Sequence, residues 1–465
     1  MNSETTKKIE ALILESMTDQ IVPGLAVAVV KGDQITHLEG YGFADLEKRI
    51  PFTPDSSYQI GSTSKNLTGF AIAQLLERGL IDLDASVTAY VPYFQVDHTQ
   101  SDSITVRQLL GQTSGLPATD FVYERNMPVF DIRASESMAR SLHDLKLERE
   151  PGERYEYSNY NYVTLGLIIE RVSNMPYDDY MLEHVFKPLG MTRTFAPASD
   201  WIPAALNPGT GYVYATHQPS IKRDVIMSRA WNSSGLIVSN ATDIARYLIA
   251  QLNDGVSVKG NRVISKAALE RSQTGLNLAE STLGGECEYG FGWETATREG
   301  LRVVEHGGDA RTSGSYFLLL PDQKIAVGIL MNLVDHGKIQ LVYNIAKSIL
   351  GLEVEAYQTI PKPESVPSNH FKADSKLWQK YVGEYDTVRG RLEVFVQGSE
   401  LMLKLAKGNP VAETVSLEAQ SDTEFVTRSE VLACEGIPIS FEITSSGTEI
   451  RCEGKAFTQL EAKHD

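Results

Sequence analysis

Strand-like segments stand at both ends of residues 1–352, and helical segments lie between them. Near the start, an apolar run rich in valine at 25–30 and a short run at 35–38 flank the turn 31–34, which predicts a β-hairpin. Later strand-like runs occupy 301–305, 313–320 and 325–331. We therefore expect an α/β (α+β) fold, in which an antiparallel sheet is flanked by helices and receives strands from both sides of an inserted helical region.

Helical periodicity dominates residues 63–260 and also marks both ends of this unit. The first 17 residues place Ile9, Leu12, Ile13 and Met17 on one face of an amphipathic helix. A closing helix is expected at 338–350, ending at a glycine. The helical patterns between them lie at 63–78, 106–110, 162–172 and 241–252.

A proline-bearing stretch at 353–373 separates this unit from a region of different character. Proline removes backbone donors and favours extended chain, so the stretch is expected to be a semi-rigid linker. Beyond it, strand candidates follow at 377–385, 391–396, 401–405, 414–417, 424–427, 439–443 and 449–452. Short strands at close spacing are typical of a small β-barrel or sandwich. We therefore expect domains at 1–352 and 374–465.

Composition excludes several classes of partner. The net charge of the 465 residues is −17 and there is no basic run, so no nucleic-acid partner is expected. No run of about eighteen apolar residues indicates a membrane span. The N-terminal segment lacks the features of a signal peptide, so a cytoplasmic location is expected, or secretion if a leader had been removed. Three scattered cysteines indicate neither a disulfide framework nor a metal site, and no cofactor is expected.

The tetrapeptide Ser62-Thr63-Ser64-Lys65 begins the helical pattern at 63–78. A serine three residues before a lysine on a helix places both side chains on one face, one turn apart. A desolvated lysine amine can lose its proton near neutral pH and then take the proton of the serine hydroxyl. Because S-x-x-K also arises by chance, the motif becomes a nucleophile hypothesis only with partners elsewhere in the chain.

Two later segments supply candidate partners. Tyr157 and Asn159 lie in the segment 155–160, on a loop before a helix, where they would provide a base and an amide; they would otherwise be a packing residue and a helix cap. His306, Gly307 and Gly308 follow a strand, where glycines allow close backbone approach; the alternative is a β-bulge with a partly exposed histidine.

In chain order, S-x-x-K at a helix start, Y-x-N on a loop and H-G-G on a late edge strand resemble the superfamily of penicillin-binding proteins and class C β-lactamases. Further phrases in the style of this family lie at 40–45, 113–117, 188–191, 289–293, 321–322 and 331–332. The resemblance covers residues 5–352 and implies a β-lactamase/transpeptidase-like fold. Residues 374–465, opening with the phrase at 381–385, resemble the lipocalin-like barrel appended to several of these hydrolases.

The resemblance implies a role for each matching residue. Ser62 is expected to be acylated, with Lys65 as its activating partner and Tyr157 as the base that also protonates the leaving group. The other implied positions are Asn159 against the acyl substituent, His306 in place of the third motif's lysine, Gly307 and Gly308 shaping the strand, and Asp309 supplying, with Ser62, the N–H groups of an oxyanion hole.

Two departures from the third motif of the family, which is usually K-T-G, bear on substrate: His306 replaces the lysine, and Gly307 replaces the hydroxyl residue after it. Histidine is mostly neutral at pH 7, so the cation that binds a β-lactam carboxylate is weakened. Efficient β-lactam hydrolysis is therefore not expected. Gln112 stands where relatives often carry histidine, and no catalytic role is inferred for it.

These observations predict a cofactor-free serine hydrolase that forms an acyl-enzyme on amide or ester bonds. The first expectation is a peptidase or amidase acting on small peptides, with D-residue specificity as one form. An esterase, thioesterase or acyltransferase of the same family is the alternative. Alternatives from another functional class are a penicillin-recognising sensor or binding protein without substrate turnover, and a catalytically dead scaffold on the same fold. A homo-oligomer remains open.

Overall fold

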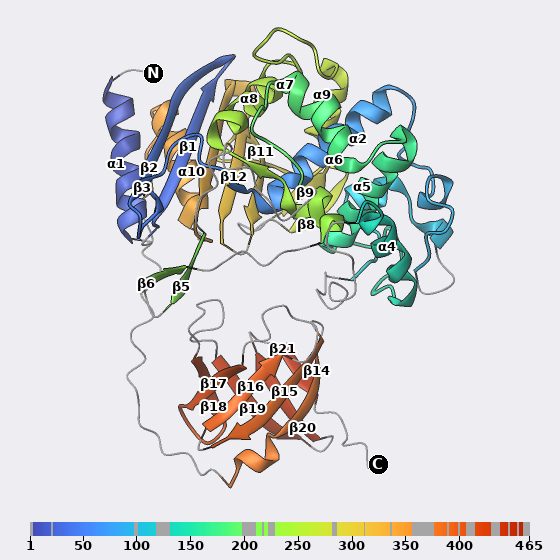
Figure 1. The fold of residues 1–465 in the computed structure, drawn as a ribbon, viewed down its shortest axis with the longest axis vertical. Helices are drawn as coiled ribbons and strands as arrows, with labels where there is room; N and C mark the ends of the chain where they lie inside the picture. Colours follow the sequence, from blue (N-terminus) through green and yellow to red (C-terminus); the bar gives the residue numbers. More distant parts are fainter. Residues whose placement is uncertain are drawn as a thin grey trace. The chain divides into compact units, whose positions relative to one another are not determined.

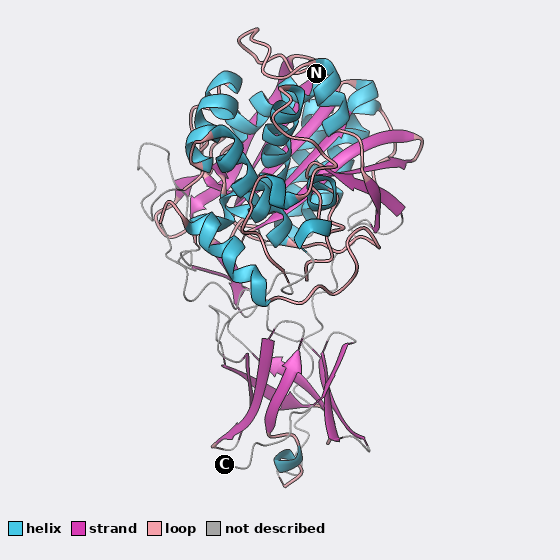
Figure 2. Cartoon of the chain, turned by 90° about the vertical axis from the view of Figure 1, so that its right-hand side faces the viewer, coloured by secondary structure: helices cyan, strands magenta, loops and turns pink. Residues whose placement is uncertain are grey.

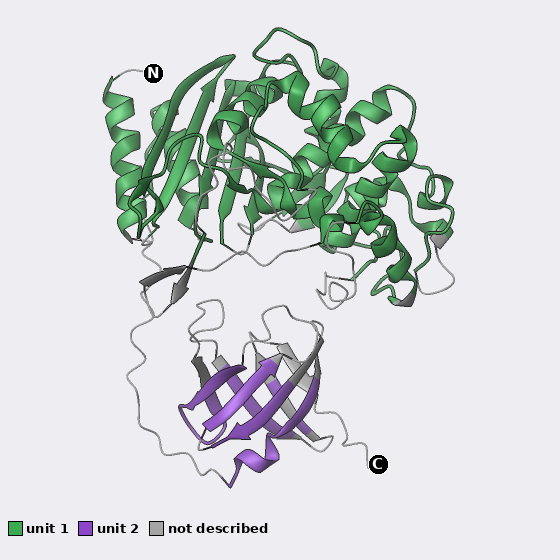
Figure 3. Ribbon diagram, in the orientation of Figure 1, with its two compact units in different colours: residues 1–118, 127–212, 221–357 green, residues 119–126, 213–220, 358–465 purple. Residues whose placement is uncertain are grey.

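The computed structural model describes most of the chain (Figure 1). The described residues are 3–19, 22–96, 101–117, 131–197, 211–215, 218–221, 228–280, 286–310, 312–334, 337–355, 376–387, 390–398, 400–405, 414–428, 438–444, 447–452 and 455–458. Figure 3 shows two compact units, drawn from residues 1–118, 127–212 and 221–357 and from residues 119–126, 213–220 and 358–465. None of the helices in the described part of the chain combines the length and apolar character needed to cross a bilayer.

The first unit is built on one nine-stranded antiparallel sheet of order β3-β2-β1-β13-β12-β11-β10-β9-β8. Its strands are β1 Gly24–Lys31, β2 Gln34–Asp45, β3 Ile50–Pro51, β8 Asn277–Glu280, β9 Glu286–Gly290, β10 Trp293–Arg298, β11 Leu301–Asp309, β12 Gly314–Leu320 and β13 Ile325–Met331. The N-terminal hairpin joins the late strands through β1 and β13, with Leu25 opposite Met331. The expected antiparallel sheet with strands from both ends of the unit is therefore confirmed.

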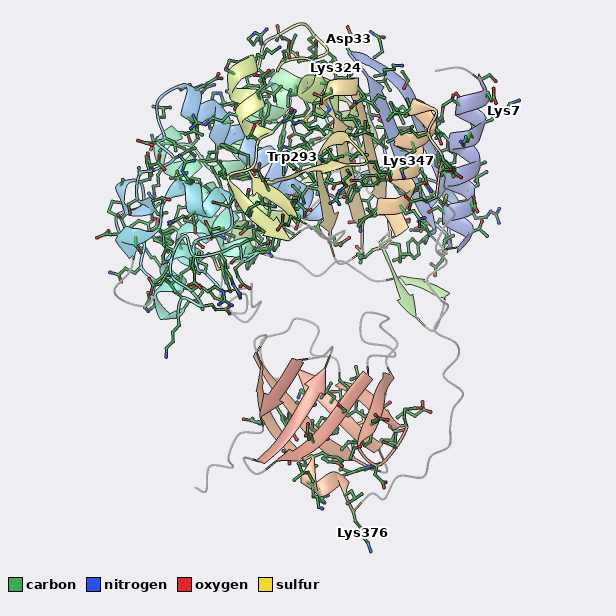
Figure 4. All side chains as sticks on the ribbon, turned by 180° about the vertical axis from the view of Figure 1, so that it is seen from behind. Lys7, Asp33, Trp293, Lys324, Lys347 and Lys376 are labelled. Atoms are coloured by element: carbon green, nitrogen blue, oxygen red, sulfur yellow. The ribbon has the colours of Figure 1, made fainter. Side chains whose placement is uncertain are left out.

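Helices cover both faces of the central strands. Every residue of β12 and β13 is buried, as expected of apolar strands packed on both sides. Helix α8 (Ala241–Leu252) packs against β1 and β13, whereas α10 (Gly337–Leu350) packs against β12, β13 and α1 (Ser3–Asp19). Figure 4 shows Trp293, at the start of β10, enclosed within this unit, where its side chain is 1% exposed.

The inserted region carries the remaining helices, as expected. Its α-helices are α2 Ser64–Glu77, α3 Val106–Leu110, α4 Ala134–Ser141, α5 Asn159–Ser173, α6 Tyr177–Met181, α7 Lys187–Leu189 and α9 Lys266–Ser272. Short helical turns are η1 Gly61–Thr63, η2 Val87–Ala89, η3 Ser101–Ser103, η5 Leu142–Asp144, η6 Leu182–Phe186, η8 Arg229–Trp231, η9 Asn232–Leu236 and, between β12 and β13, η10 Pro321–Gln323. A small sheet pairs β4 Tyr58–Gln59 with β7 Val238–Ser239. Strands β5 Tyr212–Ala215 and β6 Gln218–Ile221 pair with each other, and residues 213–220 of this pair are grouped with the second unit.

Two local expectations for this unit were wrong. The segment His306–Asp309 does not lie on an edge strand, because β11 stands inside the sheet between β12 and β10. However, β10 pairs with β11 only as far as Glu305, so the end of β11 has a paired strand on the β12 side alone. Asn159 does not lie on a loop: it is the first residue of α5, which begins three residues before the expected start.

The second unit is an eight-stranded antiparallel sheet in which each strand pairs with the next along the chain. Its strands are β14 Gly383–Thr387, β15 Gly390–Gln397, β16 Glu400–Leu405, β17 Thr414–Ala419, β18 Glu424–Arg428, β19 Pro438–Thr444, β20 Gly447–Cys452 and β21 Lys455–Thr458. Figure 2 shows the sheet curling, and its two outer strands, β14 and β21, lie close together. Tyr381 stacks on Phe441 in the core, with ring centroids 4.3 Å apart.

The start of this unit differs from the expectation of a strand at 377–385. Residues Trp378–Lys380 form a 3-10 turn, η11, and β14 begins only at Gly383. The turn closes through hydrogen bonds from the backbone N–H groups of Tyr381 and Val382 to the carbonyl of Trp378. Apolar residues at this point therefore belong to a turn that covers one end of the sheet core, where Trp378 packs.

Candidate active site

Ser62 sits on the 3-10 turn η1, immediately before α2. Thr63 Oγ1 and Ser315 Oγ both donate to the carbonyl of Ile60, at 2.8 and 2.7 Å, and so tie the turn to β12. Ser62 itself remains partly exposed, whereas Lys65 on the first turn of α2 is 0% exposed. The two side chains meet, as their spacing predicts, with Nζ 3.2 Å from Oγ.

Glycine allows β11 to approach this turn closely. A Cβ atom on Gly308 would lie 2.1 Å from the carbonyl oxygen of Ile60. Gly61 has φ +56°, and a Cβ there would lie 2.5 Å from the backbone nitrogen of Asp309. Any side chain at either position would push the strand away from the turn that carries Ser62.

Lys65 lies in a ring of acceptors. Its Nζ is 2.6 Å from Oδ1 of Asn159 and 2.6 Å from the carbonyl oxygen of Ser234 on η9, in addition to Ser62 Oγ. Burial places the pKa of the Lys65 amine well below its usual value, because desolvation disfavours the charged ammonium form. These contacts bring Ser62, Lys65 and Asn159 together as the sequence predicts, although the partner of Asn159 here is the lysine.

Tyr157 faces Ser62 from the segment before α5. Its hydroxyl donates to Ser62 Oγ at 2.8 Å, and Lys65 Nζ lies 4.9 Å from the centre of its ring. Burial raises the pKa of the Tyr157 phenol above its usual value, an effect that the hydrogen bond to Ser62 only partly offsets. The Ser62 hydroxyl therefore lies between a protonated phenol and a lysine amine of depressed pKa.

His306 is a buried wall residue beside this group. Its Nδ1 lies 2.6 Å from the carbonyl oxygen of Gly307 and its Nε2 lies 3.1 Å from the hydroxyl of Tyr289. A carbonyl only accepts, so Nδ1 carries the hydrogen and Nε2 accepts from Tyr289. Burial, with Lys65 nearby, lowers the pKa of His306 to about 3. Its described contacts reach Tyr157 through ring packing, 6.4 Å between centroids, and do not include Ser62.

The end of β11 presents a backbone N–H next to Ser62. In an antiparallel ladder, hydrogen-bonded pairs alternate with non-hydrogen-bonded pairs. Ala310 N donates to Ser313 O at 2.8 Å, so the next pair, Asp309 opposite Gly314, is of the second kind. The N–H of Asp309 therefore points away from β12, toward the side that β10 leaves open. The Asp309 carboxylate is held by Lys338 Nζ of α10 at 2.5 Å.

Sequence reasoning missed three members of this neighbourhood. Tyr289, which binds His306, stood only within the phrase 289–293 that carried the family resemblance. Lys338 carried no signal beyond a place at the start of a helix. Ser234 contributes its backbone carbonyl, which depends on the path of η9 and which no side-chain pattern reveals.

Comparison with known proteins gives one consistent family. A family model described as Beta-lactamase matches residues 9–346. Protein flp of Staphylococcus aureus strain MW2 is 29% identical over 370 residues, covering 75% of this chain and 70% of that protein. Penicillin-binding protein 4* of Bacillus subtilis strain 168 is 27% identical over 399 residues, covering 82% of this chain and 84% of that protein.

Solved structures agree at the level of fold. The octameric penicillin-binding protein homologue from Pyrococcus abyssi superposes with a TM-score of 0.64 at 24% identity, covering 97% of this chain and 99% of that one. A class C beta-lactamase mutant gives a TM-score of 0.63 at 22% identity, covering 74% of this chain and 98% of that one. With its family match spanning most of the first unit, the chain belongs to the beta-lactamase family of serine hydrolases and acyltransferases, and it is similar to penicillin-binding proteins.

Proposed function

We propose that this protein cleaves amide or ester bonds through an acyl-enzyme on Ser62, and that peptides are its first substrate class. The observation that carries the proposal is the position of the Ser62 hydroxyl, 3.2 Å from Lys65 Nζ and 2.8 Å from the Tyr157 hydroxyl. A serine is a weak nucleophile unless an adjacent group takes its proton. A group that can take the proton of Ser62 and a group that can donate a proton to the leaving group thus both lie within hydrogen-bond distance of Ser62 Oγ.

Lys65 is the group that takes the serine proton. A neutral amine has two N–H bonds and one lone pair, and the oxygens of Asn159 and Ser234, which only accept here, occupy both N–H bonds. The lone pair then faces Ser62 Oγ. The depressed pKa of Lys65 and the raised pKa of Tyr157 favour this assignment over a tyrosinate base.

The remaining steps follow from the same contacts. Ser62 Oγ bonds to the substrate carbonyl carbon while its proton passes to Lys65. The oxyanion is stabilised by the N–H of Ser62, on the first helical turn before α2, and by the N–H of Asp309. Tyr157 gives its proton to the leaving amine or alcohol and regains one from Lys65. Water, or another nucleophile, then enters by the reverse route and releases the acyl group.

The third motif supports substrates that do not depend on a carboxylate anchor. His306 is buried and neutral at physiological pH, so this position offers no cation to a β-lactam carboxylate. We therefore place peptides, including those with D-residues, before β-lactams. Esters and thioesters, with transfer of the acyl group to an amine, form the second candidate, because the same hydrogen bonds serve an oxygen or sulfur leaving group.

Intact mass spectrometry of the full chain tests this proposal. The protein is incubated with matched D- and L-peptides and with simple esters, and product release is followed in parallel. The expected result is an acyl adduct that Ser62→Ala does not form, together with many turnovers per protein. An adduct without turnover would make the protein a sensor or binding protein. No adduct and no product from any substrate class would overturn the hydrolase.

Assembly and domain division are further parts of the proposal, and both rest on likeness to relatives. The Pyrococcus abyssi homologue is described as octameric, which supports a homo-oligomer of this chain as well. We also propose that 374–465 is a lipocalin-like domain joined by the linker 353–373 to the hydrolase domain 1–352. Light scattering measures the first point, and limited proteolysis, with expected cleavage confined to the linker, measures the second.

A further inference from the structure

Gln112 is a buried residue in a strained conformation. It follows α3 by two residues, it is 0% exposed, and its φ of 59° lies in the left-handed region. Residues other than glycine rarely adopt this region, and when they do the surrounding contacts must hold them there. The hydrogen bonds of Gln112 therefore have to account for its left-handed backbone.

These contacts are hydrogen bonds to the backbone on both sides of Tyr157. The carbonyl oxygen of Gln112 accepts from Glu156 N at 2.8 Å, and its side-chain Oε1 accepts from Ser158 N at 3.0 Å. Asn161 Nδ2 donates to the same Oε1 at 2.5 Å, which fixes the amide plane. The residue that presents its hydroxyl to Ser62 is thus flanked by two N–H groups held by a single neighbour.

We propose that Gln112 is a positioning residue that sets the distance from the Tyr157 hydroxyl to Ser62 Oγ. This inference rests on the proposed function, because it assumes that the 2.8 Å contact transfers a proton. The segment 155–158 lies before α5 and has no strand or helix of its own to hold it in place. Gln112 supplies the backbone partners that a regular element would supply, and its left-handed conformation aims carbonyl and side chain at the same segment.

The functional atom of the side chain is Oε1. Within the described part of the chain, Nε2 of Gln112 is buried and makes no hydrogen bond. A glutamate keeps the acceptor oxygen, whereas a leucine of similar size removes it. The pair Gln112→Leu and Gln112→Glu therefore separates loss of the acceptor from loss of the amide group.

The molecule contains a matched control. Gln251 on α8 is also buried, its Oε1 accepts from Gln273 Nε2 at 2.8 Å, and its Nε2 is likewise without a described partner. Gln251→Leu removes the same chemistry from a place that does not touch segment 155–158. Its effect measures what a buried glutamine contributes to stability alone.

The experiment uses the full chain and measures the rate constant for acylation of Ser62, its substrate dissociation constant, and amide hydrogen exchange at Glu156 and Ser158. Gln112→Leu is expected to slow acylation about tenfold to a hundredfold with little change in substrate affinity, since misplacement of a proton donor by about 1 Å has effects of this size. In Gln112→Leu the amide of Ser158, which loses its side-chain acceptor, is expected to exchange faster than in the wild type, whereas the amide of Glu156 keeps its backbone acceptor and serves as the internal reference. Gln112→Glu is expected to recover most of the rate, and Gln251→Leu to retain all of it.

Two results would overturn the inference. One is an acylation rate in Gln112→Leu that equals that of Gln251→Leu. The other is unchanged amide exchange at Ser158 in Gln112→Leu. If the wild-type protein forms no acyl-enzyme, the proposed function fails, whereas the exchange measurement still decides whether Gln112 holds this segment.

Discussion

The two sides of the site are held by different means. On the nucleophile side, η1 and β11 are in direct backbone contact, and glycines at 61 and 308 leave no room for a Cβ between them. On the proton-donor side, Tyr157 lies in an irregular segment that polar groups of Gln112 hold by hydrogen bonds. Close packing resists displacement in every direction, whereas a few hydrogen bonds fix only the atoms they join. The nucleophile side should therefore be stiff, and the donor side adjustable.

The largest expected effect is at Lys65. Lys65→Met removes the base, so we expect acylation of Ser62 to fall by about a thousandfold, within the range found for general base catalysis. Removal of a buried amine that is costly to desolvate and loss of its hydrogen bonds to Asn159 and Ser234 act in opposite directions, so the free energy of unfolding should change little. Stopped-flow acylation and chemical denaturation measure the two quantities. A variant that retains the wild-type rate would show that another group takes the serine proton.

On the donor side, Tyr157→Phe removes only the hydroxyl that contacts Ser62. Turnover should fall about a hundredfold, as for loss of a general acid. Tyr155→Phe is the matched control. Tyr155 lies two residues before Tyr157 and packs on Tyr289, with ring centroids 5.5 Å apart, so this variant should keep the wild-type turnover rate. Steady-state kinetics on an amide substrate provide the comparison. Equal losses in the two variants would assign the effect to packing.

Adjacent glycines test the stiffness of the nucleophile side. A Cβ at Gly308 would meet backbone oxygen, so Gly308→Ala should destabilise by about 1–3 kcal/mol through strain and should slow acylation. At Gly307 the nearest atom is the ring edge of Tyr316 at 3.3 Å, which can shift, so Gly307→Ala should stay within about 0.5 kcal/mol. Thermal unfolding of both variants measures the difference. The prediction fails if the two alanines are equivalent.

At His306 the expected effect is confined to acidic solution, as a change in how the free energy of unfolding depends on pH. Its pKa is about 3 in the folded protein against an ordinary 6.5, so between these values the unfolded chain binds more protons. Stability from this group is thus complete above pH 6.5 and is lost as the pH falls, by at most about 1.4 kcal/mol per pH unit. Unfolding between pH 4 and 8 should be less acid-sensitive in His306→Asn. Parallel curves for wild type and variant would exclude a neutral buried histidine.

The difference between the nucleophile side and the proton-donor side also explains which parts of the site could be predicted from the sequence. Ser62 and Lys65 are three residues apart, so helix geometry alone brings them together. The 2.8 Å contact between Ser62 and Tyr157 joins residues 95 positions apart, and only the order of motifs and the family resemblance pointed to it. Local patterns were right about element type for the sheet and for the helices, including α8 and α10.

What the sequence did not reveal depends on neighbours. The segment at 306–309 was expected at an edge because nothing local shows that β10 joins β11, or that β8 extends the sheet further. The first strand of the second unit was expected to begin near 377, because apolar residues that cover a core resemble strand residues. The contribution of Gln112 was not expected, because it depends on a left-handed backbone that polarity patterns do not show.

The pairing of Leu25 with Met331 also has a consequence for how the chain is made. Strand β1 is apolar throughout its buried length, and β2 can pair with one of its edges at once. Its other partner, β13, emerges from the ribosome about 300 residues later, so the nascent chain must leave one edge of a hydrophobic strand unpaired for many seconds at ordinary elongation rates. Contacts this distant in sequence form slowly, because their loop-closure entropy comes before any gain. Folding yield should therefore depend on chaperones that shield β1 during synthesis.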